Sequence, residues 1–254
     1  MPDNSAFQEF YLREIGVHTP VSLHLSTASA GDDTVEPQVS PKHAPERAAT
    51  EHKIPAKTEA SENIEALISD NPLQDLAIQA ASCTACQLSE QRHSVVFGVG
   101  NPEAEIVFIG EAPGREEDLK GEPFVGRAGQ LLDRMLAAQG LDREQVYIMN
   151  TVKCRPPNNR DPKPEEVQAC GRWFDAQLKA LSPKLICLLG RVAAQTLLET
   201  DASLSAMRGK WHDYHGIPLR VLYHPAYLLR SPQQKRHAWS DLCELKKRYQ
   251  LLSD

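Results

Sequence analysis

From about residue 64 onward, short apolar runs alternate with segments whose hydrophobic positions recur at helical spacing. Four of the runs predict strands, at residues 104–110 (AEIVFIG), 145–150 (QVYIMN), 184–190 (KLICLLG) and 217–224 (IPLRVLYH). Their apolar residues are nearly continuous rather than alternating with polar ones. This pattern is typical of parallel strands that are covered on both faces.

Helical segments lie between these strands. The segment RAGQLLDRMLAAQG (127–140) has an apolar stripe and ends in glycine, and residues 163–183 begin with a proline and two glutamates. Residues 191–200 and 235–252 complete the pattern. Alternating strands and helices predict an α/β fold with a central, mostly parallel four-stranded sheet.

Three of the predicted strands end in polar or conformationally special residues. These are Gly110 with Glu111, Asn150, and His224. Ligands of parallel α/β sheets bind beyond the carboxyl ends of the strands. We therefore expect these residues to converge on one cleft.

The first 63 residues lack this alternation. Residues 19–63 are rich in Thr, Ser, Ala, Pro and Glu and predict a disordered acidic linker, so we expect the compact domain at 64–254. Residues 1–18 contain Phe7, Phe10, Tyr11 and Ile15 at helical spacing. This peptide either packs on its own domain or binds a partner. A short similarity to the N-terminal peptide of the clamp-loader psi subunit implies a replication or repair protein as that partner.

Composition narrows the class of protein. The chain has 254 residues, of which 41% are hydrophobic and 24% charged, as is ordinary for globular proteins. No apolar run approaches the roughly 20 residues of a membrane span, and the first residues do not resemble a signal peptide, so we expect a cytoplasmic protein. The net charge of −6 is uneven. Residues 1–77 hold 5 Lys and Arg against 13 Asp and Glu, and the remaining 23 and 21 leave a net charge of +2, which is compatible with an anionic partner.

Four of the six cysteines form two pairs. Cys83 and Cys86 lie in a CxxC motif, and Cys154 and Cys170 are separated by fifteen residues. Two such pairs can hold Zn²⁺ or an iron–sulfur cluster, and the spacing alone does not choose between them. A lone CxxC can also be a redox dithiol, but that chemistry favours a position after a strand, and this motif precedes the first one. Cys187 and Cys243 are expected to be core residues.

Six motifs together carry a family resemblance. They are GEAPGREED, GEPFVGRAGQLL, YIMNTVKCRPPNNRDP, LGRVAAQ, MRGKW and YHPAYLLR, in this order. Over roughly residues 78–250 the chain resembles the family 4, iron–sulfur uracil-DNA glycosylases. The resemblance implies a three-layer α/β/α domain with a [4Fe-4S] cluster whose ligands are Cys83, Cys86, Cys154 and Cys170. It also implies that the protein hydrolyses the N-glycosidic bond of a flipped-out deoxyuridine in single- and double-stranded DNA, which leaves an abasic site. We expect a monomer.

The resemblance assigns the uracil-binding residues. Phe124 matches the aromatic residue that stacks on the flipped base, although a lone phenylalanine would otherwise be interpreted as core packing. Asn150 matches the amide that reads the base edge. An amide offers both a donor and an acceptor, so it can pair with O4 and N3–H of uracil but not with the opposite pattern of cytosine. His224 matches the histidine that faces O2, where its N–H can stabilise the anionic leaving group.

The GEAPG motif supplies the remaining catalytic group. In the family this loop lies beneath the sugar and the base, so Gly110 and Ala112 are expected to contact uracil. Glu111 is the nearest carboxylate that could act on water or on the sugar cation, and Ala112 cannot activate water. Glu117 and Phe124 are expected to exclude the methyl group of thymine.

The stretch YHPAYLLRSP places apolar residues beside the histidine, in what the sequence suggests is a loop. Loops are usually polar, so these residues need a function. An enzyme that extrudes a base must hold the gap open, and Tyr227, Leu228 and Leu229 are candidates for the wedge that does so. Arg230 is expected to contact a flanking phosphate, as are Arg208 and Lys210 of the MRGKW motif.

Other activities remain alternatives. A DNA-binding module could sense uracil or redox state without excision. A uracil binder that traps its product covalently would need a histidine in the stretch TVKCRPPNNRDPKPEE, which has none. An acyl or phosphoryl hydrolase is disfavoured because the chain has no GxSxG elbow and no P-loop.

Overall fold

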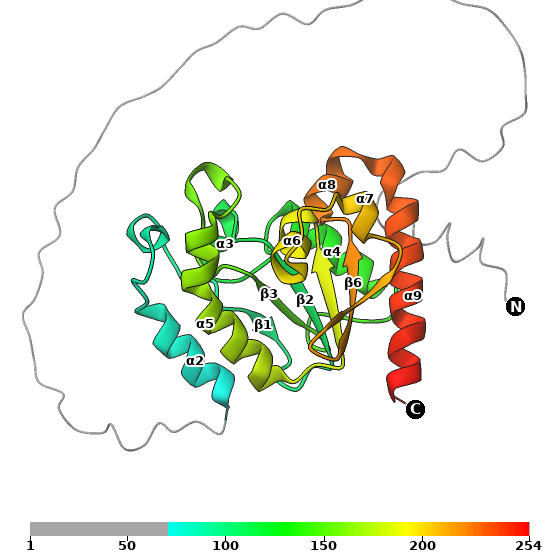
Figure 1. The fold of residues 1–254 in the computed structure, drawn as a ribbon, viewed down its shortest axis with the longest axis horizontal. Helices are drawn as coiled ribbons and strands as arrows, with labels where there is room; N and C mark the ends of the chain where they lie inside the picture. The colour runs from blue at the N-terminus through cyan, green and yellow to red at the C-terminus, as the bar shows by residue number, and fades with distance from the viewer. Residues whose placement is uncertain (1–70, 254) are drawn as a thin grey trace, which may run out of the picture. The chain divides into compact units, whose positions relative to one another are not determined.

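The computed structural model describes residues 71–253, which form a sheet between two layers of helices (Figure 1). Within these residues the sheet has six strands: β1 (Val99–Gly100), β2 (Ile106–Gly110), β3 (Tyr147–Asn150), β4 (Leu185–Leu189), β5 (Trp211–Tyr214) and β6 (Ile217–Leu222). The α-helices are α2 (Pro72–Ala81), α3 (Arg115–Lys120), α4 (Arg127–Ala137), α5 (Pro164–Leu181), α6 (Arg191–Leu198), α7 (Leu204–Met207), α8 (Pro225–Arg230) and α9 (Lys235–Ser253). Short 3₁₀ helices lie at Gln87–Glu90, Pro157–Asn159 and Pro232–Gln234.

The strand order is β1-β3-β2-β4-β6-β5, and the four central strands are all parallel. This confirms the α/β fold and the four parallel strands. The predicted total of four strands was wrong, because β1 and β5 add antiparallel edges. The edge strand β1 has only two residues, too few for a pattern to be visible. The other, β5, joins β6 through His215 and Gly216, which both have positive φ and form a tight hairpin turn.

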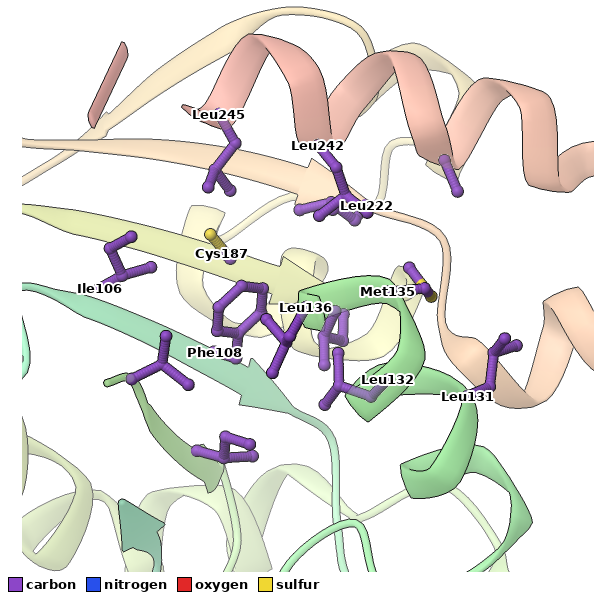
Figure 2. Packing of buried hydrophobic residues seen from close by; sticks show 14 of the residues in the cluster. Ile106, Phe108, Leu131, Leu132, Met135, Leu136, Cys187, Leu222, Leu242 and Leu245 are labelled. Atoms are coloured by element: carbon purple, nitrogen blue, oxygen red, sulfur yellow. The ribbon is translucent and has the colours of Figure 1, made fainter. Parts of the chain in front are cut away.

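Successive residues of each central strand point to opposite helical layers. On β2, Ile106 and Phe108 pack with α4, α8 and α9, whereas Val107 and Ile109 pack with α2, α5, α6 and α7. Figure 2 shows the first of these cores, where side chains of α4 and α9 meet those of the strands. The α/β/α layering implied by the family resemblance is therefore present.

The segment after His224 is a helix rather than a loop. Residues Pro225–Arg230 form α8, with His224 as its N-cap and a proline at its first position. The apolar character of this segment has a structural cause, because Leu228 is fully buried in the core that the sheet shares with α4 and α9. The sequence interpretation missed the helix because its six residues span less than two turns.

Some of the predictions concern residues that the structure does not describe. The peptide at 1–18 and the linker at 19–63 fall wholly outside the described residues, as do the first residues of the predicted 64–254 domain. Among the helices within residues 71–253, none is both long and apolar enough to cross a bilayer.

A buried ion cluster ties α9 to the sheet. Asp241 of α9 forms ion pairs with Arg220 of β6 at 2.9 Å and with Arg208 at 2.8 Å. Asp241 is 2% exposed, so its carboxylate is the counter-ion of two largely buried cations. The Arg208 guanidinium also lies 4.2 Å from the centre of the Tyr223 ring.

Replacing Asp241 should strongly destabilise the domain. Asp241→Ala would leave two buried guanidinium groups without their anion, and breaking a buried ion pair in this way costs about 3–5 kcal/mol. Urea denaturation should show this loss. The control is Glu244→Ala on the same helix, where the exposed pair with Lys247 should contribute little to stability. Equal losses in the two variants would contradict the structural role of Asp241.

Candidate active site

The carboxyl ends of the four parallel strands open into a cavity of about 660 Å³. One residue at or just after the end of each strand lines this cavity: Glu111 after β2, Asn150 at the end of β3, Gly190 after β4 and His224 after β6. The predicted convergence of Glu111, Asn150 and His224 on one cleft is therefore confirmed. Glu117, Phe124 and Ala112 also line this cavity.

Asn150 brings an unpaired acceptor to the cavity wall. Its side chain is 2% exposed, and its Oδ1 has no hydrogen-bond partner among the described residues. Gly110 makes room for this amide, since a Cβ there would lie only 2.4 Å from Oδ1. A buried polar atom without a partner is costly, by about 1–3 kcal/mol. The arrangement is suited to a ligand that donates a hydrogen bond to Oδ1.

Phe124 forms the apolar wall beside this amide. Its ring lies against Gly110, where a Cβ would approach within 2.7 Å, and its centroid is 5.6 Å from that of the His224 ring. The loop around Phe124 is anchored by Glu117, whose Oε1 accepts the backbone N–H groups of Val125 and Gly126 at 3.0 Å. Glu117 thus supports the backbone of the wall and also lines the cavity.

His224 is held as a neutral hydrogen-bond donor. Its Nδ1 accepts the backbone N–H of Ala226 at 3.1 Å, so the ring proton belongs on Nε2. Burial lowers the pKa of His224 to about 4, with Arg230 acting in the same direction and Glu117 against it. At neutral pH the imidazole is therefore uncharged and carries its one N–H on Nε2.

Glu111 shares the mouth of the cavity with a second carboxylate. Burial, together with the charge of Asp161 and a hydrogen bond to it, raises the pKa of Glu111 to about 7, while Arg191 opposes the shift. Arg191 also pairs with Asp161 at 2.9 Å. Glu111 is consequently protonated in a large fraction of molecules near neutral pH and ionised above it.

The residues predicted to contact DNA occupy different environments. Tyr227 and Leu229 are half-buried, Arg230 is exposed, and both Tyr227 and Arg230 line the cavity. Leu228 is fully buried in the core, so the structure contradicts its prediction as a wedge. Lys210 is exposed. The mostly buried Arg208 is engaged by Asp241 and Tyr223, which favours a structural role; its phosphate contact stays a prediction.

The two cysteine pairs meet at a second, small cavity. It is lined by Cys83, Cys86, Cys154 and Cys170, although 86 residues separate the first from the last. N–H groups point at three of the sulfur atoms. Arg172 donates to Cys83 at 3.3 Å, Arg92 donates to Cys154 at 3.2 Å, and the backbone N–H of Lys153 donates to Cys170 at 3.3 Å.

The protonation of these thiols depends on their surroundings. Burial raises the pKa of Cys154 to about 11, against the effect of Arg92, and it also raises the pKa of Cys170. Burial raises the pKa of Cys83, but hydrogen bonds from the Ala85 backbone and Arg172, together with the charge of Arg172, outweigh it, so the pKa is lowered overall. Metal binding would displace protons from the buried thiols, as cysteine ligation requires.

The donor set fits an iron–sulfur cluster. Within residues 71–253, no three His, Cys, Asp or Glu side chains are arranged for a single metal ion. A single zinc ion needs all its thiolate sulfurs about 2.3 Å from one point. The thiolates of a four-iron cluster each bind a different iron atom, so they can stand farther apart around one cavity.

The other two cysteines differ in burial. Cys187 is fully buried in β4, which confirms its prediction as a core residue, and burial raises its pKa well above the usual value. Cys243 is half-buried on α9 and packs against the same core.

Lys153 connects the cysteine cavity to the active-site strand. This lysine is 1% exposed, and its Nζ donates to the backbone carbonyl of Asn150 at 2.9 Å and to Oε1 of Gln177. Gln177 in turn donates to Tyr147 of β3 and to the carbonyl of Phe97. The buried network thus joins the backbone next to Cys154 to the strand that carries the unpaired amide.

Sequence reasoning missed four polar residues that line the active-site cavity: Asn159, Arg160, Asp161 and Arg191. Arg191 directly follows Gly190 at the end of β4, and the strand-end rule that identified Asn150 would also have identified it. Asp161 lies in the loop between Cys154 and Cys170, and only the fold brings it beside Glu111. No local pattern in the sequence could have indicated that proximity.

Comparisons with known proteins identify a family match and several relatives of this chain. Residues 97–243 match the uracil DNA glycosylase superfamily. The chain is 50% identical over 177 residues to a type-4 uracil-DNA glycosylase of Archaeoglobus fulgidus, covering 66% of this chain and 89% of that protein. It is 49% identical over 154 residues to the type-4 enzyme of Thermotoga maritima, covering 59% and 79%. A type-5 uracil-DNA glycosylase of Thermus thermophilus is 37% identical over 118 residues, covering 41% and 53%.

Glu111 should titrate near pH 7, and its neighbours should move that midpoint in opposite directions. Asp161→Asn removes a negative charge that favours the protonated form, so the pKa of Glu111 should fall. Arg191→Gln removes a positive charge that favours the ionised form, so the pKa should rise. Carboxyl ¹³C chemical shifts of labelled glutamate, followed against pH, measure both changes. A midpoint that neither substitution moves would contradict this electrostatic arrangement.

Proposed function

Because this chain belongs to the uracil DNA glycosylase superfamily, we propose that it removes uracil from DNA by hydrolysing the N-glycosidic bond of a deoxyuridine that has been flipped out of the stack. The product is an abasic site for subsequent base excision repair. We further propose that the enzyme acts as a monomer on single- and double-stranded DNA.

The unpaired Oδ1 of Asn150 is the observation that carries this proposal. Uracil offers N3–H as a donor to this oxygen and O4 as an acceptor for the amide NH₂ group. Cytosine presents an acceptor at N3, which would leave the buried oxygen unpaired and set it against a second acceptor. The ring of Phe124 supplies the apolar surface against which a planar base stacks beside this amide.

His224 stabilises the leaving group. Cleavage of the glycosidic bond transfers the bonding electrons to uracil, and negative charge develops on O2. The Nε2–H of His224 donates to this oxygen, and the contact of Nδ1 with Ala226 holds the ring in the required tautomer. A neutral donor is suited to this role because it can stabilise the anion without the cost of holding a positive charge in a buried site.

Glu111 acts on the sugar side of the bond. Above about pH 7 its carboxylate is ionised, and it can stabilise the cation-like sugar or accept a proton from the attacking water. Below that pH it is protonated, and the reaction should slow. Ala112 and Gly110 keep the neighbouring backbone close to the base without adding a side chain that could compete with Glu111.

The surface around α8 opens the DNA. Tyr227 and Leu229 are the apolar side chains of this segment that remain partly accessible, so we assign the wedge to them instead of Leu228. Arg230 is exposed at the rim of the cavity and contacts a phosphate beside the gap. Lys210 is a second exposed cation available to the backbone of the DNA.

The four cysteines hold a [4Fe-4S] cluster. When bound, it acts as a structural cross-link, since its thiolate ligands come from both ends of the 154–170 segment and from the 83–86 segment. The segment between Cys154 and Cys170 carries Asn159, Arg160 and Asp161 to the wall of the active-site cavity. Anchoring its two ends therefore fixes the groups that surround Glu111.

Substitutions of His224 and Leu229 should affect the rate of uracil excision differently on single-stranded and duplex DNA. We expect the wild-type protein to release uracil from both single-stranded and duplex oligonucleotides. His224→Ala should slow single-turnover excision on both by about 10²–10³-fold, because it removes a donor that acts mainly in the transition state. Leu229→Ala should be slow on the duplex and largely restored on single strands, where no stack has to be opened.

Alkaline cleavage at abasic sites measures these rates. A wild-type protein that binds uracil-containing DNA without producing abasic sites would sink the proposed activity and favour a sensor. Equal single-strand to duplex ratios for the two variants would instead reject only the division of roles around α8. Leu228→Ala serves as the contrast. This substitution should lower the folding stability of the protein, so its effect should not depend on whether the DNA is single-stranded or duplex.

Iron content should distinguish the ligand cysteines from the core cysteine. Protein purified without air should be brown and contain about four irons per chain. Cys154→Ala should lose the cluster, whereas Cys187→Ala, which changes an equally buried thiol outside the small cavity, should retain it. Iron analysis and visible absorbance measure both variants. Stoichiometric zinc without visible absorbance would overturn the iron assignment.

A further inference from the structure

The backbone of Phe124 adopts a conformation that an aromatic residue rarely takes. Its φ is 53°, in the left-handed region, where the Cβ of any residue other than glycine is crowded. Such a conformation persists only when the surrounding structure enforces it, and it often marks a functional position. The side chain that this backbone presents is the apolar wall of the active-site cavity.

One face of this strained loop is held by a residue that no motif identified. Arg143, in the loop between α4 and β3, donates from one guanidinium nitrogen to the Pro123 carbonyl at 2.7 Å and from the other to the Phe124 carbonyl at 3.1 Å. Its planar fork therefore fixes two successive peptide groups at once, which a lysine could not do. Arg143 is not among the residues that line the cavity in the described part of the chain.

Arg143 is itself held in place from two directions. Asp133 of α4 accepts from the same nitrogen that contacts the Phe124 carbonyl, at 2.8 Å. The loop that carries Arg143 is fixed by Asp142, whose Oδ1 accepts the backbone N–H groups of Glu144 and Gln145. The guanidinium is thus oriented before any ligand arrives.

The other contacts of the loop are complementary to those of Arg143. Glu117 accepts the backbone N–H groups of the two residues that follow Phe124. The N–H groups of this loop are therefore bound by Glu117, and its carbonyl groups by Arg143. Gly129 lets α4 approach this loop, because a Cβ there would lie 1.7 Å from the Phe124 carbonyl oxygen. Among these anchors, Arg143 alone binds the carbonyls of Pro123 and Phe124 through its side chain.

We propose that Arg143, oriented by Asp133, is a positioning residue that fixes Phe124 for stacking on the uracil ring. This inference rests on the proposed function. Without the fork, the Phe124 peptide can relax toward ordinary φ values, and the ring leaves the position that faces the base. The fraction of molecules with a formed stacking wall then falls, and apparent affinity for uracil falls in proportion.

Binding of free uracil tests this proposal apart from DNA opening. Arg143→Met keeps the aliphatic stem and removes the fork, and it should weaken inhibition by free uracil about tenfold if only a tenth of the molecules keep the stacking wall. Arg143→Lys should recover only part of this loss, since one ammonium cannot hold both carbonyls. Arg134→Met removes a cation from an exposed position on α4 and should leave uracil inhibition unchanged. Affinity for DNA that already contains an abasic site should be the same in wild type and Arg143→Met.

The outcomes separate this role from simple stabilisation. A lower melting temperature in Arg143→Met with unchanged uracil inhibition would overturn the proposal. If Arg143→Met does not fold, Asp133→Asn is the second variant, and it should weaken uracil inhibition about threefold because the guanidinium loses its orientation but not its fork. Unchanged inhibition in Asp133→Asn would then overturn it. Failure of the wild-type protein to excise uracil would reject the proposed function instead.

Discussion

The active site is organised around one buried amide whose oxygen has no partner in the described part of the protein. Asn150 carries this group at the end of a central strand, where the parallel register places it directly across from Gly110. An interior acceptor without a donor destabilises the fold, so its retention indicates a requirement other than stability. The missing side chain of Gly110 and the aromatic wall of Phe124 both leave the oxygen free for a ligand.

A second constraint connects this amide to the cysteines. The buried Nζ of Lys153 donates to the Asn150 carbonyl, and the same residue's backbone N–H points at the Cys170 sulfur. The loop that begins beyond it returns to the active site and sets Asp161 beside Glu111. The cysteine site and the catalytic site are therefore parts of one buried framework. Through this framework, a group bound by the four cysteines would influence the position of the residues around Glu111.

The central sheet and the strand-end residues could be predicted from the sequence, and the reason is physical. Buried parallel strands need continuous apolar runs, and parallel ends meet at one edge, so Glu111, Asn150 and His224 had to converge. The errors arose where burial depends on three-dimensional packing. Leu228 looked like an exposed wedge because its segment was interpreted as a loop whose apolar residues needed a function, yet it is fully buried in the core. Asp161 could not be predicted, since its distance from Glu111 is set by a loop of irregular structure.

In the proposed complex, the Asn150 carboxamide reads the polar edge of uracil beneath Phe124 and beside His224. A crystal structure of the protein with free uracil bound would show whether this contact forms. We expect the ring to stack on Phe124, with N3 within hydrogen-bonding distance of the Asn150 oxygen that is unpaired without ligand and with O2 facing Nε2 of His224. Uracil bound elsewhere in the cavity, or bound with its N3 directed away from Asn150, would refute this role of Asn150.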